Sequence, residues 1–259
     1  MEPYRLTRRR LVAAGITSGI AAATVLRLPR ATLAADTCTL IPEQELGPYY
    51  IAEELLRGDV TEGRPGIPLA LKIVVLDARS CRPLAGAAVD IWHCDSQGVY
   101  SGFTQASAMP SPPPDAAPPG GTPTGQPPLN PPGDAQTFLR GIQIAAADGV
   151  AGFRTILPGC YPGRTNHIHF KVRIDGAAAG KTYQGGHVAH TGQVFFPEEI
   201  AAALMQAAPY AAHKVHRTTQ QEDGVFTRQH GAAAVAKLQP LATGGFAATL
   251  VAAVDPTAV

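Results

Sequence analysis

The sequence is poor in charge and has no long apolar run. Only 16% of its 259 residues are Asp, Glu, Lys or Arg, and the formal net charge is +1 at pH 7. Without a basic stripe, the chain is not expected to bind nucleic acid through the phosphate backbone. The apolar run at residues 13–26 is shorter than the roughly 20 residues of a membrane-spanning helix. We therefore expect no stable membrane anchor.

Cysteine is scarce and lacks the spacing of a zinc site. The four cysteines are Cys38, Cys81, Cys94 and Cys160, and no Cys-x-x-Cys pattern is present. In an oxidising compartment an even number favours one or two disulfides, but four cysteines permit three pairings. Cys160 directly precedes Tyr161, so it either fixes that loop through a bridge or is a buried free thiol.

The first 34 residues have the composition of an export signal. The segment TRRRLV at 7–12 matches the twin-arginine type, and a moderately apolar run of small residues follows it. Thr32 and Ala34 favour cleavage after Ala34, with Ala35 as a second possibility. Removal of residues 1–34 would leave 15 basic and 19 acidic residues. We expect an exported protein, periplasmic or secreted.

The remaining residues, 35–259, are predicted to form one all-β domain. Short strands are expected at 69–76, 87–93, 138–146, 167–174, 193–196, 232–242 and 246–254. Thr243-Gly244-Gly245 would join the last two as a hairpin. One helix is expected at 198–213, after Pro197. This pattern is typical of a β-sandwich with one short helix and long loops.

Two segments of the domain are predicted to be loops. Residues 110–132 contain eleven prolines and almost nothing apolar, so a proline-rich insertion is expected at 104–135. Residues 176–192 are rich in glycine and carry His187 and His190. These two histidines are weak metal candidates because a flexible loop holds ligands poorly.

The stretch FRTILPGCYPGRTNHIHFKVRI at 153–174 carries the strongest functional signal. Polar and apolar residues alternate from His167 onward, so His167 and His169 are expected side by side on one face of a half-buried strand. Pro162 and Gly163 suit a type II turn that would return Tyr161 and Arg164 toward that strand. A His-x-His pair alone is weak, because exposed strands carry such pairs without a chemical reason.

A second stretch, LAGAAVDIWHCDSQGVYSGF at 84–103, places Tyr100 just after a predicted strand. Two imidazoles with two phenolates form a donor set of two negative charges, which favours iron(III). Zinc more often takes three histidines, or histidines with a carboxylate. The carboxylate-containing iron(II) triad also fits poorly, since Asp90 and Asp95 are the only acidic residues in the two stretches.

The two stretches together resemble a known enzyme family. A Gly-x-Tyr-Ser segment at 98–101, followed by Tyr-Pro-x-Arg-x-x-His-x-His at 161–169, closely resembles the intradiol ring-cleavage dioxygenases of the catechol and protocatechuate type. The resemblance covers most of the chain beyond its N-terminus. It implies non-haem Fe(3+) and insertion of both atoms of O2 between the two hydroxyl-bearing carbons of a catechol-type substrate. The product would be of the cis,cis-muconate type.

The resemblance also implies a role for individual residues. The four iron ligands would be Tyr100, Tyr161, His167 and His169. Tyr161 would be the axial tyrosine, which leaves the iron when a catechol binds. Arg164 would stabilise negative charge developing beside the ring, and Gln193 would lie near the O2 side. In the extended segment at 38–51, called the lead-in segment below, Tyr49 or Tyr50 would line the substrate pocket, although packing against the sheet is an equal alternative.

Some features depart from this resemblance. No helical dimerisation segment like that of the catechol-type enzymes is visible, and export is unusual for the family; no oligomeric state is predicted. The turn at 81–87 also resembles transthyretin-like and adhesin-like β-sandwich modules, which leaves a non-catalytic binding module as the alternative function. A catalytically inactive metal-binding relative and an extradiol iron(II) enzyme are further alternatives.

Overall fold

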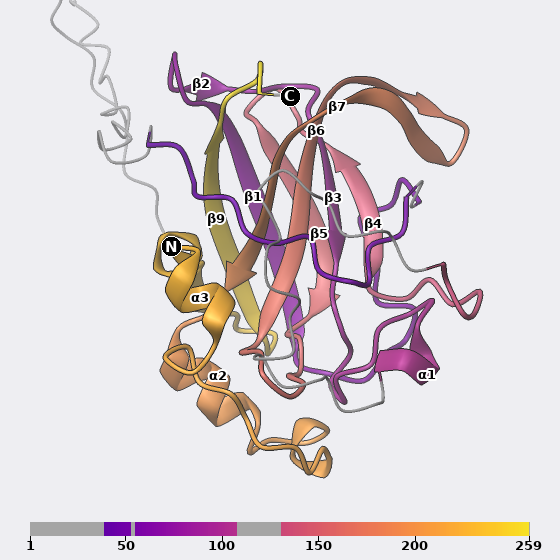
Figure 1. The fold of residues 1–259 in the computed structure, drawn as a ribbon, viewed down its shortest axis with the longest axis vertical. Coiled ribbons are helices and arrows are strands. Elements are labelled where there is room, and N and C mark those ends of the chain that lie inside the picture. Colours follow the sequence, from indigo (N-terminus) through magenta and orange to yellow (C-terminus); the bar gives the residue numbers. More distant parts are fainter. Residues whose placement is uncertain (1–38, 53–54, 108–130, 259) are drawn as a thin grey trace, which may run out of the picture. The chain divides into compact units, whose positions relative to one another are not determined.

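Two β-sheets packed face to face form the fold (Figure 1). The structure is a computed structural model, and it describes residues 39–52, 55–107 and 131–258. The predicted export signal at 1–34, Cys38 and residues 108–130 of the predicted proline-rich insertion lie outside these residues. The predicted all-β sandwich is confirmed.

One sheet has five strands arranged around β1 (Pro68–Asp77). Along one edge of β1 lie β2 (Arg82–Pro83) and β5 (Val150–Ile156), both antiparallel to it. Along the other edge lies β9 (Phe246–Val254), which is parallel to β1 and carries β8 (Lys237–Pro240) on its far side. Alternate residues of β1 point into the core, as a half-buried strand requires: Leu69, Leu71, Ile73 and Val75.

The second sheet has four antiparallel strands in the order β4-β3-β6-β7. Their bounds are Arg140–Ile144 for β4, Ala88–Trp92 for β3, His167–Ala179 for β6 and Thr182–Phe195 for β7. Ile168, Phe170 and Val172 of β6 join the same core as the apolar residues of β1. Because side chains alternate along a strand, His167 and His169 lie on the opposite face of this sheet.

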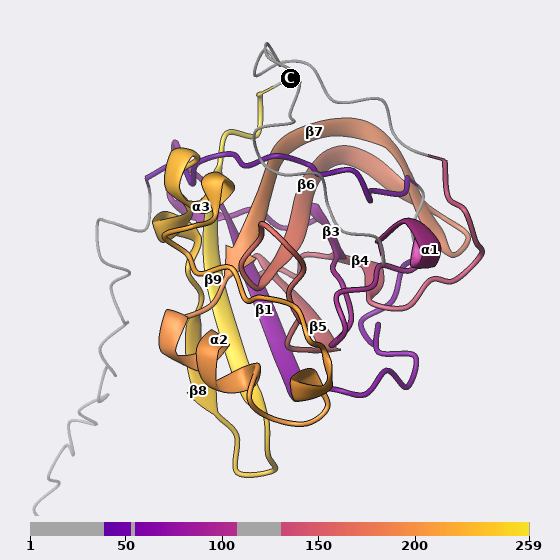
Figure 2. The same ribbon diagram turned by 60° about the horizontal axis from the view of Figure 1, so that its bottom comes forward.

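Helices are few and short in the described part of the chain. They are α1 (Thr104–Ser107), α2 (Glu198–Leu204) and α3 (Gly224–Arg228), with 3-10 turns at Tyr210–Ala212 and Gly231–Ala234. Both views place α2 and α3 on the side of the domain where β9 lies (Figure 2). The predicted helix at 198–213 is too long: α2 ends at Leu204, and Pro209 has no N–H to continue a helix.

The glycine-rich loop predicted at 176–192 is wrong. β6 and β7 continue through it as a long hairpin, in which Ala179 pairs with Thr182 across the turn. Glycine is needed here for close packing, since a Cβ at Gly176 would lie 2.5 Å from the Tyr183 ring. His187 and His190 therefore sit on strand β7, and the predicted strand at 193–196 is only the end of that strand.

Other boundaries follow the sequence more closely. The strands predicted at 69–76, 87–93 and 246–254 match β1, β3 and β9 to within one or two residues. β4 and β8 are shorter than predicted, and neither β2 nor β5 was predicted. Within the described ranges, no helix has the length and apolar character to cross a membrane.

Candidate metal centre

The four predicted ligands meet at one end of the outer face of the four-stranded sheet. His167 and His169 open β6, Tyr161 lies in the connection from β5 to β6, and Tyr100 follows β3. The two histidine Nε2 atoms are 3.1 Å apart, and Tyr161 Oη is 3.2 Å from His167 Nε2. The rings of Tyr100 and Tyr161 meet edge to face with centroids 5.8 Å apart. Two imidazoles and two phenols thus converge from three segments of the chain.

The predicted turn brings Tyr161 into this cluster. The Arg164 backbone N–H donates to the Tyr161 carbonyl oxygen at 3.2 Å, which closes a turn around Pro162 and Gly163. Gly163 has a φ of 83°, a conformation that costs little only for glycine. The turn therefore depends on this glycine, and the Tyr161 ring reaches back to the start of β6.

The histidine face is buried, although the alternation predicted a half-exposed strand. The exposed fraction is at most 1% for His167 and His169. The Trp92 indole stacks on His169, with centroids 5.0 Å apart and the planes 6° from parallel. A Cβ on Gly47 would lie 3.0 Å from Cε1 of the same imidazole. A second layer, made of the lead-in segment and the loops after β3 and β5, covers this end of the sheet.

The hydrogen bonds define one imidazole lone pair. His167 Nδ1 lies 2.6 Å from the Thr165 carbonyl oxygen, which can only accept, so Nδ1 carries the proton and Nε2 carries a lone pair. Burial lowers the pKa of both histidines well below the usual range, and the positive charge of Arg164 acts in the same direction. Both imidazoles are therefore neutral, the form that binds metal ions.

Burial has the opposite effect on the pKa of the two phenols. Burial raises the pKa of Tyr100 and of Tyr161, while the nearby charge of Arg164 lowers it in each case. The Tyr100 hydroxyl is buried and makes no hydrogen bond of ordinary geometry within the described residues. A phenolate here would need a further positive charge beside it.

These residues fit a single metal ion. Nitrogen and oxygen ligands lie about 2.0–2.2 Å from a metal ion, so neighbouring ligands are roughly 3 Å apart, as the Nε2 and Oη atoms are here. An ion would receive the His167 lone pair and satisfy the orphaned Tyr100 hydroxyl as a phenolate. In the described part of the chain no group of three or more His, Cys, Asp or Glu could hold a metal ion. A metal site here therefore depends on its tyrosines.

Arg164 and Gln193, which the sequence placed beside the ligands, contact each other. Arg164 Nη2 donates to Gln193 Oε1. Gln193 lies opposite His169 in the ladder between β6 and β7, and its Nε2 donates to the Glu45 carbonyl oxygen at 3.0 Å. Because Arg164 affects the pKa of all four candidate ligands, its charge is felt throughout the cluster.

Sequence reasoning missed the residues that hold Arg164. Arg164 Nε donates to both carboxylate oxygens of Asp223, at 3.0 and 3.2 Å, and Nη1 lies 3.3 Å from Glu45 Oε1. Asp223 precedes α3 and is fully buried, whereas the Glu45 side chain is 46% exposed. Asp223 is the N-cap of α3, and a capping residue gives no sequence signal of contact with a residue so distant in the chain.

Of the four remaining candidate residues, only one reaches the cluster of candidate ligands. Tyr49 reaches the cluster, with its ring centroid 4.6 Å from that of Tyr100, whereas Tyr50 packs on Trp92 and donates to Asp90 Oδ2. His187 Nε2 lies 2.9 Å from the Pro256 carbonyl oxygen, and His190 packs on Phe170. These two histidines contact none of the four candidate ligands.

The cysteine pattern is resolved in part. Cys81 is disulfide-bonded, whereas Cys94 and Cys160 are buried free thiols. A bridge at Cys160 therefore does not fix the Tyr161 loop. Burial raises the pKa of the Cys160 thiol to about 11, so it is protonated and unreactive at neutral pH.

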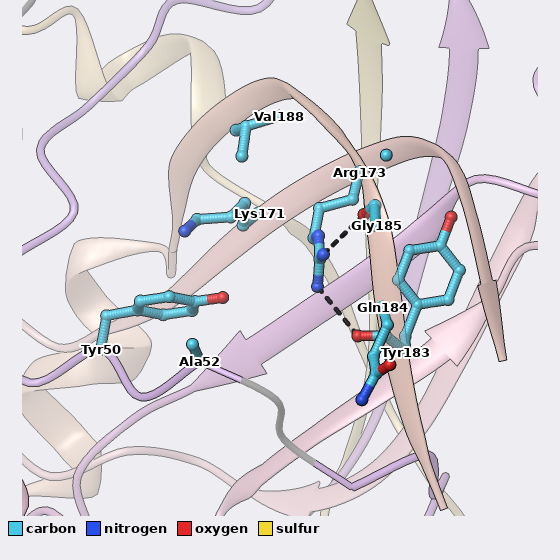
Figure 3. Close-up of a pocket in the computed structure, with 9 residues that line it drawn as sticks. Tyr50, Ala52, Lys171, Arg173, Tyr183, Gln184, Gly185 and Val188 are labelled. Carbon is cyan, nitrogen blue, oxygen red and sulfur yellow. Dashed lines mark hydrogen bonds between the residues drawn. The ribbon is translucent and has the colours of Figure 1, made fainter. Parts of the chain in front are cut away.

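A surface pocket lies on the same sheet face, farther along β6 (Figure 3). Its volume is about 490 Å³, and Tyr50, Lys171, Arg173 and Tyr183 are among the residues that line it. Arg173 donates to the carbonyl oxygens of Tyr183 and Gly185 at 3.3 and 2.7 Å. These bonds engage both terminal nitrogens of Arg173 in holding the hairpin of β6 and β7.

Comparison with known proteins gives a consistent result. An intradiol ring-cleavage dioxygenase from Tetranychus urticae has a similar structure, with a TM-score of 0.70 and 32% identity over 85% of this chain and 96% of that chain. The dioxygenase domain of a fusion with a carbohydrate-binding protein, from the cellulolytic bacterium Streptomyces sp. SirexAA-E, has a TM-score of 0.51 and 26% identity. That match covers 84% of this chain and 99% of the domain.

Sequence comparison adds one curated protein. Catechol 1,2-dioxygenase 1 of Acinetobacter lwoffii is 29% identical over 191 residues, which cover 64% of this chain. The match spans about half of that relative, 52% of its length. No protein-family model matches the chain.

Proposed function

Because the chain belongs to the intradiol ring-cleavage dioxygenases, we propose that it is a non-haem iron(III) enzyme acting on a catechol-type aromatic. It inserts both atoms of O2 between the two hydroxyl-bearing carbons and yields a cis,cis-muconate-type product. The observation that carries the proposal is the buried cluster of Tyr100, Tyr161, His167 and His169 with Arg164 beside it.

The donor set supports iron(III) as the metal. Two neutral imidazoles and two phenolates would supply two negative charges, which stabilise a trivalent ion and disfavour its reduction. The burial that keeps both imidazoles neutral also shields the site from water. Iron(III) bound here would act as a Lewis acid that activates a coordinated catechol toward O2.

The protein orients the donors before metal or substrate arrives. The Thr165 carbonyl fixes the tautomer of His167, and the Trp92 indole fixes the plane of His169. Ligands held in this way do not have to reorganise when the ion binds.

Tyr161 is suited to exchange with substrate. It is 8% exposed, whereas Tyr100, His167 and His169 are at most 1% exposed, and it stands on a turn outside the sheet. Its phenolate oxygen would accept one of the two catechol protons and would then be a neutral phenol. Burial favours the protonated phenol thereafter.

Arg164 supplies positive charge beside the reacting ring. Its guanidinium is held by Asp223, Glu45 and Gln193, and it would stabilise negative charge that develops on the substrate. Gln193 would keep the guanidinium in place from the β7 side. Tyr49, whose ring is tilted against that of Tyr100, would form part of the wall that the substrate ring meets.

We also propose that the enzyme is exported through its twin-arginine-type signal at 1–34. That route carries folded proteins, which suits a chain that must acquire its metal before leaving the cytoplasm. An extracytoplasmic enzyme of this kind would act on catechols released from plant polymers or on toxic aromatics. Cell fractionation of a strain that expresses the full chain, with and without Arg8 and Arg9 replaced by lysine, measures the export.

A visible spectrum of the purified protein tests the proposed chemistry. Phenolate bound to iron(III) absorbs visible light strongly, so the iron(III)-loaded protein should be red-brown. Catechol added without O2 should shift the band as Tyr161 gives way to substrate. Admission of O2 should then consume one O2 per catechol and yield a product that contains both oxygen atoms.

The same experiment separates the alternatives. A protein that stays colourless after reconstitution with iron(III) would count against the dioxygenase and favour a non-catalytic β-sandwich module. A coloured protein that shifts with catechol but consumes no O2 would identify a catalytically inactive relative. Activity that requires iron(II) in a colourless protein would indicate extradiol cleavage.

A further inference from the structure

Arg164 stands at the centre of contacts made by segments far apart in sequence. Its Nε donates to Asp223, Nη1 to Glu45 and Nη2 to Gln193. These three residues lie before α3, in the lead-in segment and on β7. A guanidinium has five N–H groups, so one N–H on each terminal nitrogen has no protein acceptor within the described residues. Those two groups are free for a ligand.

We propose that Asp223 is a positioning residue for the reaction: it holds the Arg164 guanidinium so that its two free N–H groups face the substrate at the metal centre. The proposal rests on the proposed function and deepens it. Asp223 itself would touch neither metal nor substrate.

Burial distinguishes Asp223 from the other carboxylate on Arg164. Asp223 has no exposed surface, and both of its oxygens lie within 3.2 Å of Nε. Glu45 is 46% exposed and makes a single contact of 3.3 Å. Water screens an exposed ion pair, whereas a fully buried pair that is also hydrogen-bonded keeps a defined geometry. Asp223 is therefore the contact that sets the orientation of Arg164.

Asp223 also connects the arginine to the backbone that precedes the histidines. Its Oδ2 accepts the Thr165 N–H at 2.9 Å, and the Thr165 carbonyl in turn fixes His167. Its Oδ1 accepts the N–H groups of Val225 and Phe226 at the start of α3. One carboxylate thus joins Arg164, the ligand-bearing segment and α3. Helix capping alone does not require the contacts of Asp223 with Arg164 and with the Thr165 N–H.

The competing interpretation is that Asp223 only caps α3. Serine and asparagine are both good N-cap residues, so substitution can separate the two roles. Asp223→Ser retains an oxygen for the helix N–H groups but is too short to reach Arg164. Asp223→Asn is nearly isosteric and loses the charge and one acceptor. Glu222→Gln is the matched control, because it removes the adjacent carboxylate, which has no contact with Arg164.

The test is a double-mutant cycle on the iron(III)-loaded enzyme. Asp223→Asn and Asp223→Ser should each lower kcat about 10- to 100-fold, the scale expected for a displaced catalytic group. The Kd of anaerobic catechol, read from the visible band, should change less than about threefold, because the loss falls on the transition state. Glu222→Gln should behave as the wild type. In an Arg164→Lys background Asp223→Asn should have almost no further effect, since the bond to Nε no longer exists.

A second readout does not depend on turnover. In gallium(III)-loaded protein, which is diamagnetic, the Arg164 Nε–H should give a slowly exchanging NMR signal that is absent from Arg164→Lys and lost in Asp223→Ser. If the wild type fails to cleave catechol, the proposed function fails, and this signal still tests the contact. The proposal is overturned if Asp223→Ser retains wild-type kcat, if the effects of Asp223→Asn and Arg164→Lys simply multiply, or if the signal persists in Asp223→Ser.

Discussion

The two sheets of this domain have similar strands and very different outer faces. On β1 the outward residues Ala70 and Lys72 are exposed, so burial alternates along the strand. On β6 the first six residues, from His167 to Val172, are all buried, on both faces. The reason is that the lead-in segment, through Gly47, and two loops, through Tyr100 and Tyr161, cover the outer face of the four-stranded sheet where β6 begins. A strand whose polar face is also buried therefore indicates the position of the candidate functional site.

Ionisable groups follow the same division. Most buried Asp, His, Lys and Arg side chains of the described residues lie on the strands of the four-stranded sheet or directly after them: Asp90, His93, Arg140, His167, His169, Lys171 and His190. The exceptions, Asp95 and Asp223, lie in loops, and Asp223 contacts Arg164. On the strands of the five-stranded sheet, all of which the structure describes, Thr155 is the only buried polar side chain. The five-stranded sheet supplies packing, and the four-stranded sheet supplies packing on one face and reactive groups on the other.

The strongest test of this division removes one candidate ligand. His169→Ala should abolish iron(III) binding and the visible band, and should lower activity by more than about a thousandfold because the metal chemistry is lost. Iron content, the visible spectrum and catechol-dependent O2 uptake measure the change. Lys72→Ala, at an outward position of β1, is the matched control and should leave all three unchanged. Retention of iron and colour in His169→Ala would remove His169 from the ligand set.

A second substitution, on the core face of β1, tests whether the five-stranded sheet supplies stability only. Ile73 is fully buried, and Ile73→Ala should lower the free energy of unfolding by about 2–5 kcal/mol through lost burial and a residual cavity. Urea denaturation measures the loss. At low denaturant the folded variant should keep the visible band of the wild type, since no candidate ligand touches Ile73. A variant that folds normally but loses iron would show that the two sheets are not functionally separate.

A fall in pH should lower the free energy of unfolding mainly through buried histidines of the four-stranded sheet. Burial lowers the pKa of His190 to about 4, from 6.5 in an unfolded chain. A group with a lowered pKa stabilises the fold above its unfolded pKa, and this contribution is lost as the pH falls from 6.5 toward 4. His190→Leu should therefore reduce the loss of unfolding free energy over this range by up to about 3 kcal/mol.

Urea denaturation at a series of pH values compares the two proteins. Burial raises the pKa of Asp90 to about 6, so Asp90 acts in the opposite sense between pH 4 and 6. Asp90 is present in both proteins, and the difference between them isolates His190. Parallel stability curves for the wild type and His190→Leu would contradict the assignment.

The parts of the molecule that the sequence predicts are those encoded locally. Alternation predicts β6, and Pro162 with Gly163 predicts the turn that returns Tyr161. The spacing of Tyr100, Tyr161, His167 and His169 anticipates a cluster that the structure does bring together. In each case a few neighbouring residues contain the necessary information.

The features that the sequence does not predict depend on packing between segments that are distant in the chain. Glycines at 176 and 186 are typical of loops, yet here they let Tyr183 and the neighbouring strand approach closely. Asp223 resembles an ordinary helix cap, and only the fold shows that it holds Arg164. The burial of the histidine face was also missed, because the covering residues come from the lead-in segment and from two separate loops.

The parallel pairing of β1 with β9 has a consequence for how the domain forms. Leu69 lies opposite Phe246 and Asp77 opposite Val254, so the first long strand is completed by the last one. The four-stranded sheet needs only residues 88–195, which leave the ribosome earlier. Closing the long loop between β1 and β9 makes a late and slow folding step. The four-stranded sheet, which bears the candidate ligands, can thus assemble before β9 pairs with β1. During synthesis, the edge of β1 that later pairs with β9 would be exposed.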